Sequence, residues 1–228
     1  MSGPDVVLVH GWGGSFARTW VEPGWTALLE DAGRRAIGVD LLGHGTAPKP
    51  HDPAAYADLT SRVVDALPDE PVDAVGFSLG AMTLLELAAR EPARFNRLVL
   101  IGIGENLFRV DEERHRAMVA AVDGVGSADD VGAQLFAQYA RQPGNDPSAL
   151  SAVLRRPGRR LAPTDLATVT MPTLVVLGDK DFAGPAAPLV DALPLATFVP
   201  LRNTDHFATT ESFGAIDAVL AFLGALPG

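Results

Sequence analysis

The chain contains no cysteine, no long apolar run and no basic cluster interleaved with aromatic residues. The lack of cysteine excludes disulfides, a thiol nucleophile and thiolate metal sites. No segment approaches the roughly 20 apolar residues that a membrane-spanning helix needs. The apolar run Val6 to Val9 is too short for a signal peptide and has no basic flank. These absences favour a cytoplasmic protein without a membrane partner.

Positive charge is also scarce, because 18 Lys and Arg residues face 28 Asp and Glu residues and the formal net charge is -10. A chain with this balance and no basic patch is an unlikely partner for nucleic acid. At 228 residues, with 47% hydrophobic and 20% charged residues, it fits one globular α/β domain with a substantial core.

Short apolar segments bounded by glycine or proline predict buried strands. They span residues 5–9, 35–40, 72–77, 97–101, 171–177 and 196–200. Helical patterns separate most of them, and strands that alternate with helices favour a mostly parallel sheet covered on both faces. The predicted fold is a doubly wound α/β sheet of six strands.

The alternation stops between residues 105 and 165, where three helical segments follow one another without a strand. A parallel crossover needs only one helix. One of the three begins at Ser127-Ala-Asp-Asp130, a capping-box pattern. We interpret residues 105–165 as a small helical lid inserted into a core of residues 1–104 and 166–228. The alternative is an appendage that only fills out the fold.

The most informative stretch is Gly76-Phe-Ser-Leu-Gly80, which joins the strand at 72–77 to a helix without loop residues. The chain must reverse sharply at Ser78, which predicts a strained backbone there. Strand and helix then approach so closely that Gly76 and Gly80 must lack a Cβ. The Ser78 hydroxyl would be exposed above a helix N-terminus, where the Leu79 N–H can stabilise an oxyanion.

A serine hydroxyl needs a base to accept its proton, and the base needs an orienting group. Of five histidines, only His206 follows the last predicted strand. Asp181 follows the strand before it, so the chain order is Ser, Asp, His, the order of α/β-hydrolases. Glu105 follows the strand at 97–101 and is an open alternative for the acid. Asp179 and Asp205 are weaker candidates.

Several further segments carry a family resemblance. They are Val9-His-Gly-Trp-Gly-Gly14, Asp40-Leu-Leu-Gly-His-Gly45, Gly178-Asp-Lys-Asp181 and His206, together with the Gly76–Gly80 turn. Over nearly its whole length the chain resembles the α/β-hydrolase superfamily, in particular the small serine esterase branch with the pimeloyl-carrier methyl ester esterases. The resemblance implies that the backbone N–H groups of Trp12 and Leu79 form the oxyanion hole. It also implies ester hydrolysis through an acyl-enzyme, without metal or cofactor.

The chain departs from the family pattern in three places. It starts at the strand before His10, so the first two strands of the usual sheet are absent. Leu42 stands where the family turn usually has proline. Asp205 precedes His206 where glycine is common, and this departure bears on the loop that holds the base.

Predicted substrate contacts come from the glycine loop and the lid. Trp12 is interpreted as a pocket wall whose indole N–H faces the substrate, or else as packing. Lid side chains at Phe108, Leu135 and Phe136, with Leu107 and Leu154 nearby, would line a pocket for short to medium acyl chains. His10 is expected to shape its loop rather than bind metal. The Arg155–Arg160 cluster is either a solvated connection or a patch for an acidic carrier protein.

The sequence leaves two other functions open. The same three residues could act on a lactone, a thioester or a C–C bond. In a different class, the chain could be a non-catalytic ligand-binding protein with a hydrolase fold. Its pattern predicts a small-molecule ester substrate and does not indicate an oligomeric state.

Overall fold

The computed structural model describes residues 3–109, 111–158 and 161–226. Its centre is one sheet of six strands in the order β2-β1-β3-β4-β5-β6, and every neighbouring pair is parallel. The strands are β1 (Val6–Val9), β2 (Ala36–Val39), β3 (Val72–Phe77), β4 (Phe95–Ile101), β5 (Thr173–Gly178) and β6 (Ala196–Leu201). The prediction of a doubly wound, parallel six-stranded sheet is confirmed.

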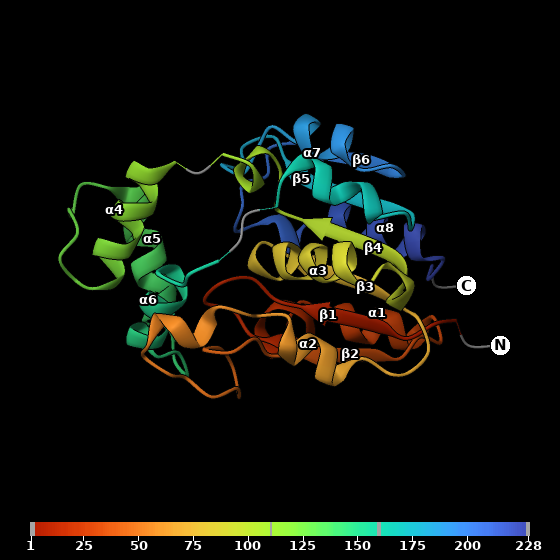
Figure 1. Ribbon diagram of the computed structural model, residues 1–228, viewed down its shortest axis with the longest axis horizontal. Helices are drawn as coiled ribbons and strands as arrows, with labels where there is room; N and C mark the ends of the chain where they lie inside the picture. The colour runs from red at the N-terminus through yellow and green to blue at the C-terminus, as the bar shows by residue number, and fades with distance from the viewer. Residues whose placement is uncertain (1–2, 110, 159–160, 227–228) are drawn as a thin grey trace.

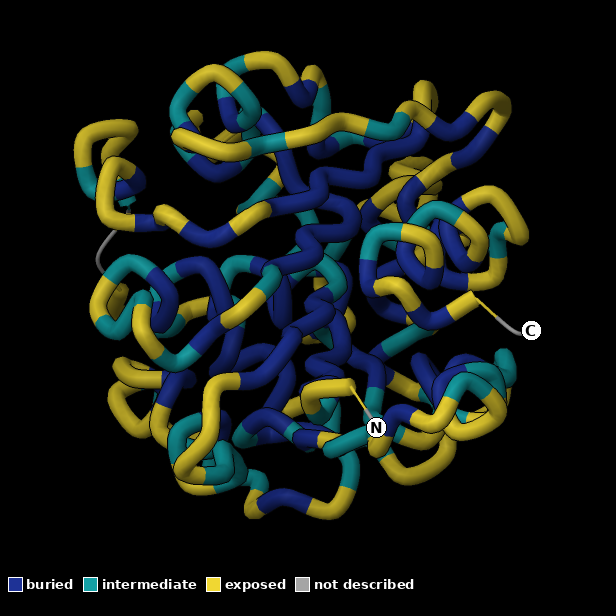
Figure 2. Tube along the Cα trace, turned by 90° about the vertical axis from the view of Figure 1, so that its right-hand side faces the viewer, coloured by how far each residue is buried: buried dark blue, intermediate teal, exposed yellow. Residues whose placement is uncertain are grey.

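Helices cover both faces of this sheet (Figure 1). They are α1 (Trp25–Asp31), α2 (Ser61–Ala66), α3 (Leu79–Arg90), α7 (Ala187–Ala192) and α8 (Phe213–Leu223). Successive strand residues point to opposite faces. Val7 and Val9 of β1 therefore pack with α2, α3 and α7, whereas Val6 and Leu8 pack with α1 and α8. Figure 2 shows the buried trace running through the middle of the molecule between these two layers.

Residues 105–168 contain helices and no strand among the residues described. The elements are η4 (Glu105–Leu107), α4 (Glu112–Val122), α5 (Val131–Ala140), α6 (Pro147–Leu154) and η5 (Pro163–Thr168). We call α4 to α6 the helical insertion. Figure 1 shows it beyond the end of the sheet toward which the β4 arrow points, opposite the two termini. The flanking turns η4 and η5 pack against the core helices α7 and α3 instead.

The start of α5 differs from the predicted capping box. Asp130 caps the helix by accepting the N–H of Ala133 at 2.9 Å. Ser127 lies one turn too early, and its hydroxyl oxygen accepts the N–H of Asp129 at 3.2 Å. The physical reason is that Ser and Asp both cap well, and the aspartate next to the first helical residue occupies the N-cap position.

A buried ion cluster ties the chain termini to the amino end of the sheet. Asp73 in β3 is fully buried, and its Oδ2 lies 2.6 Å from Arg34 Nη2 and 3.4 Å from Arg97 Nη1. Arg34 also donates to the carbonyl of Pro4 at 2.7 Å and to that of Leu223 at 2.9 Å. The cluster therefore holds the first described residues and the end of α8 together.

We expect Asp73→Ala to lower the free energy of unfolding by about 3 kcal/mol, because it leaves a buried guanidinium without its counter-charge. Urea unfolding measures this. The control is Asp5→Ala, which removes the partner of Arg35, a side chain that is 68% exposed. Solvent screens that pair, so its loss should be much smaller. Equal losses for the two variants would contradict this account of the cluster.

No helix in the described ranges has both the length and the apolarity needed to cross a bilayer.

Candidate active site

Ser78 occupies the sharp turn between β3 and α3. Its backbone angles, φ 50° and ψ -111°, are strained for a residue with a side chain. A Cβ on Gly76 would lie 2.7 Å from Ala81 Cα, and one on Gly80 would lie 2.3 Å from Val9 O. Both glycines are therefore required by the close approach of strand, helix and β1, as predicted. The Ser78 N–H donates to Ile101 O at 2.8 Å and fixes the turn to β4.

The loops after β3, β5 and β6 bring three polar side chains into one hydrogen-bonded chain. The Ser78 hydroxyl lies 3.0 Å from His206 Nε2, and His206 Nδ1 lies 2.9 Å and 3.0 Å from the two Asp181 oxygens. A carboxylate accepts only, so Nδ1 carries the proton and donates to Asp181, which leaves Nε2 to accept from the serine. His206 and Asp181 are buried. The geometry permits proton transfer from serine to imidazole.

The other three candidate carboxylates have different partners. Glu105 Oε1 lies 3.3 Å from Arg109 Nη1 in the next turn. Asp179 accepts from the N–H of Thr204, and Asp205 accepts from the two N–H groups that follow His206. Among the described residues, Asp181 is the carboxylate that contacts the His206 ring.

Aromatic side chains enclose the imidazole. The ring centroids of Phe182, Phe77 and Phe207 lie 4.4, 5.0 and 5.7 Å from that of His206. Phe182 and Phe207 are not among the residues predicted for the site. The signal that could have found them is their position, because each directly follows a member of the predicted triad. The enclosure leaves the imidazole little contact with bulk water.

The glycine-rich loop after β1 forms a tight turn next to Ser78. Gly14 N–H donates to Gly11 O at 3.1 Å, and Gly13 has φ 73°, as the third residue of a type II turn requires. A Cβ added to Gly11 would lie 3.3 Å from Ser78 Cβ. We call residues 11–14 the oxyanion turn, after the role that the resemblance implies for Trp12.

His10 holds this turn from the core side. Leu41 N–H donates to His10 Nε2 at 3.1 Å, so Nδ1 carries the proton and donates to Gly11 O at 2.7 Å. Complete burial lowers the pKa of the ring and keeps it neutral. Both ring nitrogens are engaged, which fits the expected loop-shaping role and leaves neither for a metal. Gly11 C=O and Trp12 N–H belong to one trans peptide and point in opposite directions, so the N–H faces away from His10.

His44 is a second buried histidine, with its ring centroid 5.0 Å from that of His10. Its Nδ1 lies 3.0 Å from the Leu42 carbonyl. Burial lowers the pKa of His44 from 6.5 to about 3. The unfolded chain therefore binds a proton on this residue between those pH values and the folded chain does not.

We expect stability to fall as the pH drops through this window, with a contribution of up to about 1.4 kcal/mol per pH unit from a single such group. His44→Gln retains a donor for the Leu42 carbonyl but cannot be protonated. Its urea midpoint should therefore decrease less between pH 7 and pH 4.5 than that of the parent protein. An unchanged pH dependence in the variant would contradict this assignment.

The four residues predicted to contact substrate do not line one common surface in the structure. The Trp12 indole N–H donates to Leu150 O in α6 at 3.0 Å. The indole N–H therefore does not face a substrate, because this partly buried donor pairs with a backbone carbonyl of the insertion. The alternative interpretation, packing, agrees with the contacts of Trp12 in two apolar clusters. Phe136 packs against Trp12, Phe182 and Phe207, and Phe108 packs against the main core. Leu135 is 38% exposed and lies outside these clusters, since adjacent helical residues point about 100° apart.

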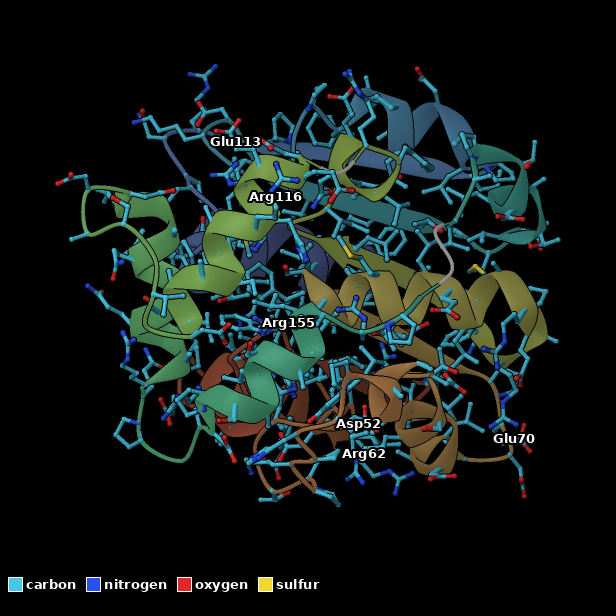
Figure 3. The ribbon with its side chains drawn as sticks, turned by 60° about the vertical axis from the view of Figure 1, so that its left-hand side comes forward. Asp52, Arg62, Glu70, Glu113, Arg116 and Arg155 are labelled. Atoms are coloured by element: carbon cyan, nitrogen blue, oxygen red, sulfur yellow. The ribbon has the colours of Figure 1, made fainter. Side chains whose placement is uncertain are left out.

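The Arg155–Arg160 cluster does not form one patch in its described part. Arg155, at the end of α6 and labelled in Figure 3, pairs with Asp123. Arg156 donates to Val153 O at 2.9 Å, and burial lowers its pKa. Arg159 and Arg160 lie outside the described residues. Arg156 is thus partly buried, whereas the charged side chains of Glu113 and Arg116 on α4, labelled in Figure 3, are exposed.

Comparison with known proteins finds relatives that are hydrolases by name. A pimeloyl-[acyl-carrier protein] methyl ester esterase from Neisseria meningitidis serogroup B is 32% identical over 217 residues, 80% of this chain and 78% of that protein. One from Aromatoleum aromaticum is 41% identical over 107 residues, 45% of this chain but only 38% of that protein. A 2-hydroxymuconate semialdehyde hydrolase from Pseudomonas sp. is 29% identical over 97% of this chain and 84% of its own length.

Solved structures share the fold at lower identity. Rv0554 from Mycobacterium tuberculosis superimposes with a TM-score of 0.77 at 22% identity, covering 100% of this chain and 93% of that one. The enol-lactonase from Burkholderia xenovorans LB400 superimposes with a TM-score of 0.72 at 23% identity, covering 98% and 92%. Residues 4–114 match the sequence profile of the alpha/beta hydrolase fold family. With the parallel sheet and these relatives, the chain belongs to the α/β-hydrolase family.

Proposed function

We propose that this protein is a serine carboxylesterase that cleaves esters of short to medium acyl chains through an acyl-enzyme intermediate. The observation that carries the proposal is the hydrogen-bonded chain from Ser78 through His206 to Asp181. Two of the relatives are named methyl ester esterases, which supports an ester as the substrate.

In the proposed reaction, Ser78 Oγ attacks the ester carbonyl carbon while His206 Nε2 takes its proton. Asp181 holds the opposite ring nitrogen and stabilises the imidazolium that forms. The tetrahedral intermediate collapses, and the imidazolium gives its proton to the leaving alcohol. Water then attacks the acyl-enzyme with the same base and releases the acid. Each step uses a protein group, so the proposal includes no metal or cofactor.

The N–H groups of Trp12 and Leu79 are the proposed oxyanion donors. Leu79 is the first residue of α3, where backbone donors have no partner inside the helix. Within the described part of the chain, neither N–H donates to a protein acceptor. Two free donors beside the nucleophile are what a developing oxyanion requires.

The proposed acyl preference rests on the surroundings of His206. Phe77, Phe182 and Phe207 crowd the ring, and Phe136 of the insertion packs over Phe182 and Phe207 with centroids 6.0 and 5.6 Å apart. We propose that the helical insertion is a lid that limits acyl length. Its compact packing favours substrates in free solution over those at a lipid interface.

The test is a series of nitrophenyl esters with acyl chains from two to sixteen carbons. Activity should be highest for the shorter chains and should not rise when a long-chain ester forms micelles. A steep rise at the micelle-forming concentration would count against the proposed lid. Stoichiometric labelling of Ser78 by a fluorophosphonate separates an enzyme from a non-catalytic binding protein, which should label poorly.

A second candidate reaction is cleavage of a C–C bond in a vinylogous diketone. It is favoured by the 2-hydroxymuconate semialdehyde hydrolase, which matches 97% of this chain. The same serine, base and oxyanion donors would serve that reaction. Adding such a compound, a lactone and a thioester to the ester panel compares kcat/KM directly, and the largest value identifies the bond type.

A further inference from the structure

The oxyanion turn is fastened to the helical insertion by Asn145. The Asn145 Nδ2 donates to Gly13 O at 2.8 Å and to Tyr139 O at 2.8 Å. Both partners are carbonyls, so only the amide nitrogen can face them, and its two hydrogens are both used. The residue thus bridges α5, the turn before α6 and the loop beside Ser78.

Other contacts join the helical insertion to the oxyanion turn or to the chain just after it. The Trp12 indole donates to Leu150 O, and Arg18 donates to Gln142 Oε1 at 2.7 Å. A Cβ added to Gly13 would lie 3.5 Å from Tyr139 Cβ, so the backbone of the turn lies close to α5. Among these donors, Asn145 is the one that binds the backbone of the turn itself.

The turn needs such an anchor because three of its four residues are glycine. Glycine places few limits on φ and ψ, so the sequence gives the turn little stiffness of its own. His10 holds Gly11 O from the core, and Asn145 holds Gly13 O from the insertion. The Trp12 N–H lies between these two fixed points.

We propose that Asn145 is a positioning residue that aligns the Trp12 N–H for the oxyanion and makes this alignment depend on the docked insertion. The inference rests on the proposed function, because it assumes that Trp12 N–H is an oxyanion donor. Loss of a whole oxyanion donor typically lowers kcat by about 10²–10³-fold. Misalignment of one of two donors should cost on the order of tenfold in kcat. KM should change by less than about twofold, because ground-state binding does not use the oxyanion contact.

The main variant is Asn145→Asp, which keeps the shape but turns two donors into a carboxylate that repels both carbonyls. Asn145→Ala is the second variant and removes the donors without adding charge. The control is His51→Ala. His51 Nε2 lies 2.8 Å from Asp146 Oδ2, so this pair also ties the insertion to the core, one residue from Asn145 but away from the oxyanion turn.

The measurements are kcat and KM on nitrophenyl butyrate, the affinity for a trifluoromethyl ketone that forms a tetrahedral adduct, and the thermal midpoint. For both Asn145 variants, kcat and the ketone affinity should fall by similar factors. For His51→Ala, both should stay within about twofold of the parent, as expected for a contact that does not act on the transition state.

The proposal is overturned if Asn145→Ala keeps the parent kcat and ketone affinity, or if His51→Ala loses as much of both. If Asn145→Asp does not fold, the kcat and ketone affinity of Asn145→Ala alone test the proposal. Failure of the underlying function gives a different result. If Ser78→Ala retained the parent activity, the serine mechanism would be wrong whatever the Asn145 variants do.

Discussion

Replacing Ser78 by alanine is expected to lower kcat for nitrophenyl ester hydrolysis by about a millionfold, the loss typical of a missing triad nucleophile. The variant loses only the hydroxyl, which contacts His206 Nε2 at 3.0 Å. The oxyanion donors and the aromatic enclosure stay in place, so a small residual rate over water should remain. Steady-state kinetics at high enzyme concentration measures the loss, and circular dichroism with a thermal midpoint checks the fold.

Thr83→Val is a matched control for this experiment. Thr83 lies one turn further along α3, and its hydroxyl donates to Leu79 O at 2.8 Å without reaching His206. Its removal should leave kcat within a few-fold of the parent. More than a few per cent of the parent activity in Ser78→Ala would contradict the serine mechanism.

Asp181→Asn is expected to lower kcat by about 10⁴-fold, the loss typical of this substitution in serine proteases with a Ser-His-Asp triad. Ala183 N–H donates to Asp181 Oδ1 at 2.8 Å and would hold the amide oxygen of asparagine there. The amide NH2 would then occupy the Oδ2 position, 2.9 Å from His206 Nδ1. Facing a donor, Nδ1 must become the acceptor, so the proton moves to Nε2 and the ring can no longer accept from Ser78.

Glu105→Gln is the control for the acid assignment and should cost less than tenfold, because Glu105 faces Arg109 instead of the imidazole. The pH dependence of kcat/KM for both variants would show whether the base is still functional. If Glu105→Gln lowered kcat by several powers of ten and Asp181→Asn lowered it only slightly, Glu105 would be the acid. The rest of the mechanism would be unchanged.

The sheet could be predicted from the sequence because each of its signals is local. Apolar runs ending in glycine mark β1, β3 and β4, and their alternation with helices sets the parallel order. Ser78 was identifiable for the same reason, since Gly76 and Gly80 are needed within two residues of it. Once the strands are parallel, the loops after β5 and β6 must lie at the same edge as Ser78.

Contacts between distant segments could not be predicted in this way. The Trp12 indole pairs with Leu150, 138 residues away, and Asn145 reaches Gly13 across 132 residues. No periodicity or motif encodes such a pairing. Leu135 and Phe136 differ by one position in α5, and a helical face cannot be assigned that finely before its neighbours are known.

The place where the insertion leaves the core has an evolutionary consequence. It departs after β4 and returns before β5, and these two strands are neighbours in the sheet. The chain leaves at the carboxyl end of β4 and returns to the amino end of β5 through η5, which packs against α3. A longer or shorter replacement changes the loop-closure free energy by only about 0.6 kcal/mol per doubling of length. If the insertion is the proposed lid, substrate preference can diverge by exchange of this one contiguous piece while the residues around Ser78 are inherited intact. Under the proposed role of Asn145, any replacement must still supply a donor for the Gly13 carbonyl, so one of the several contacts between insertion and core would be constrained by the chemistry.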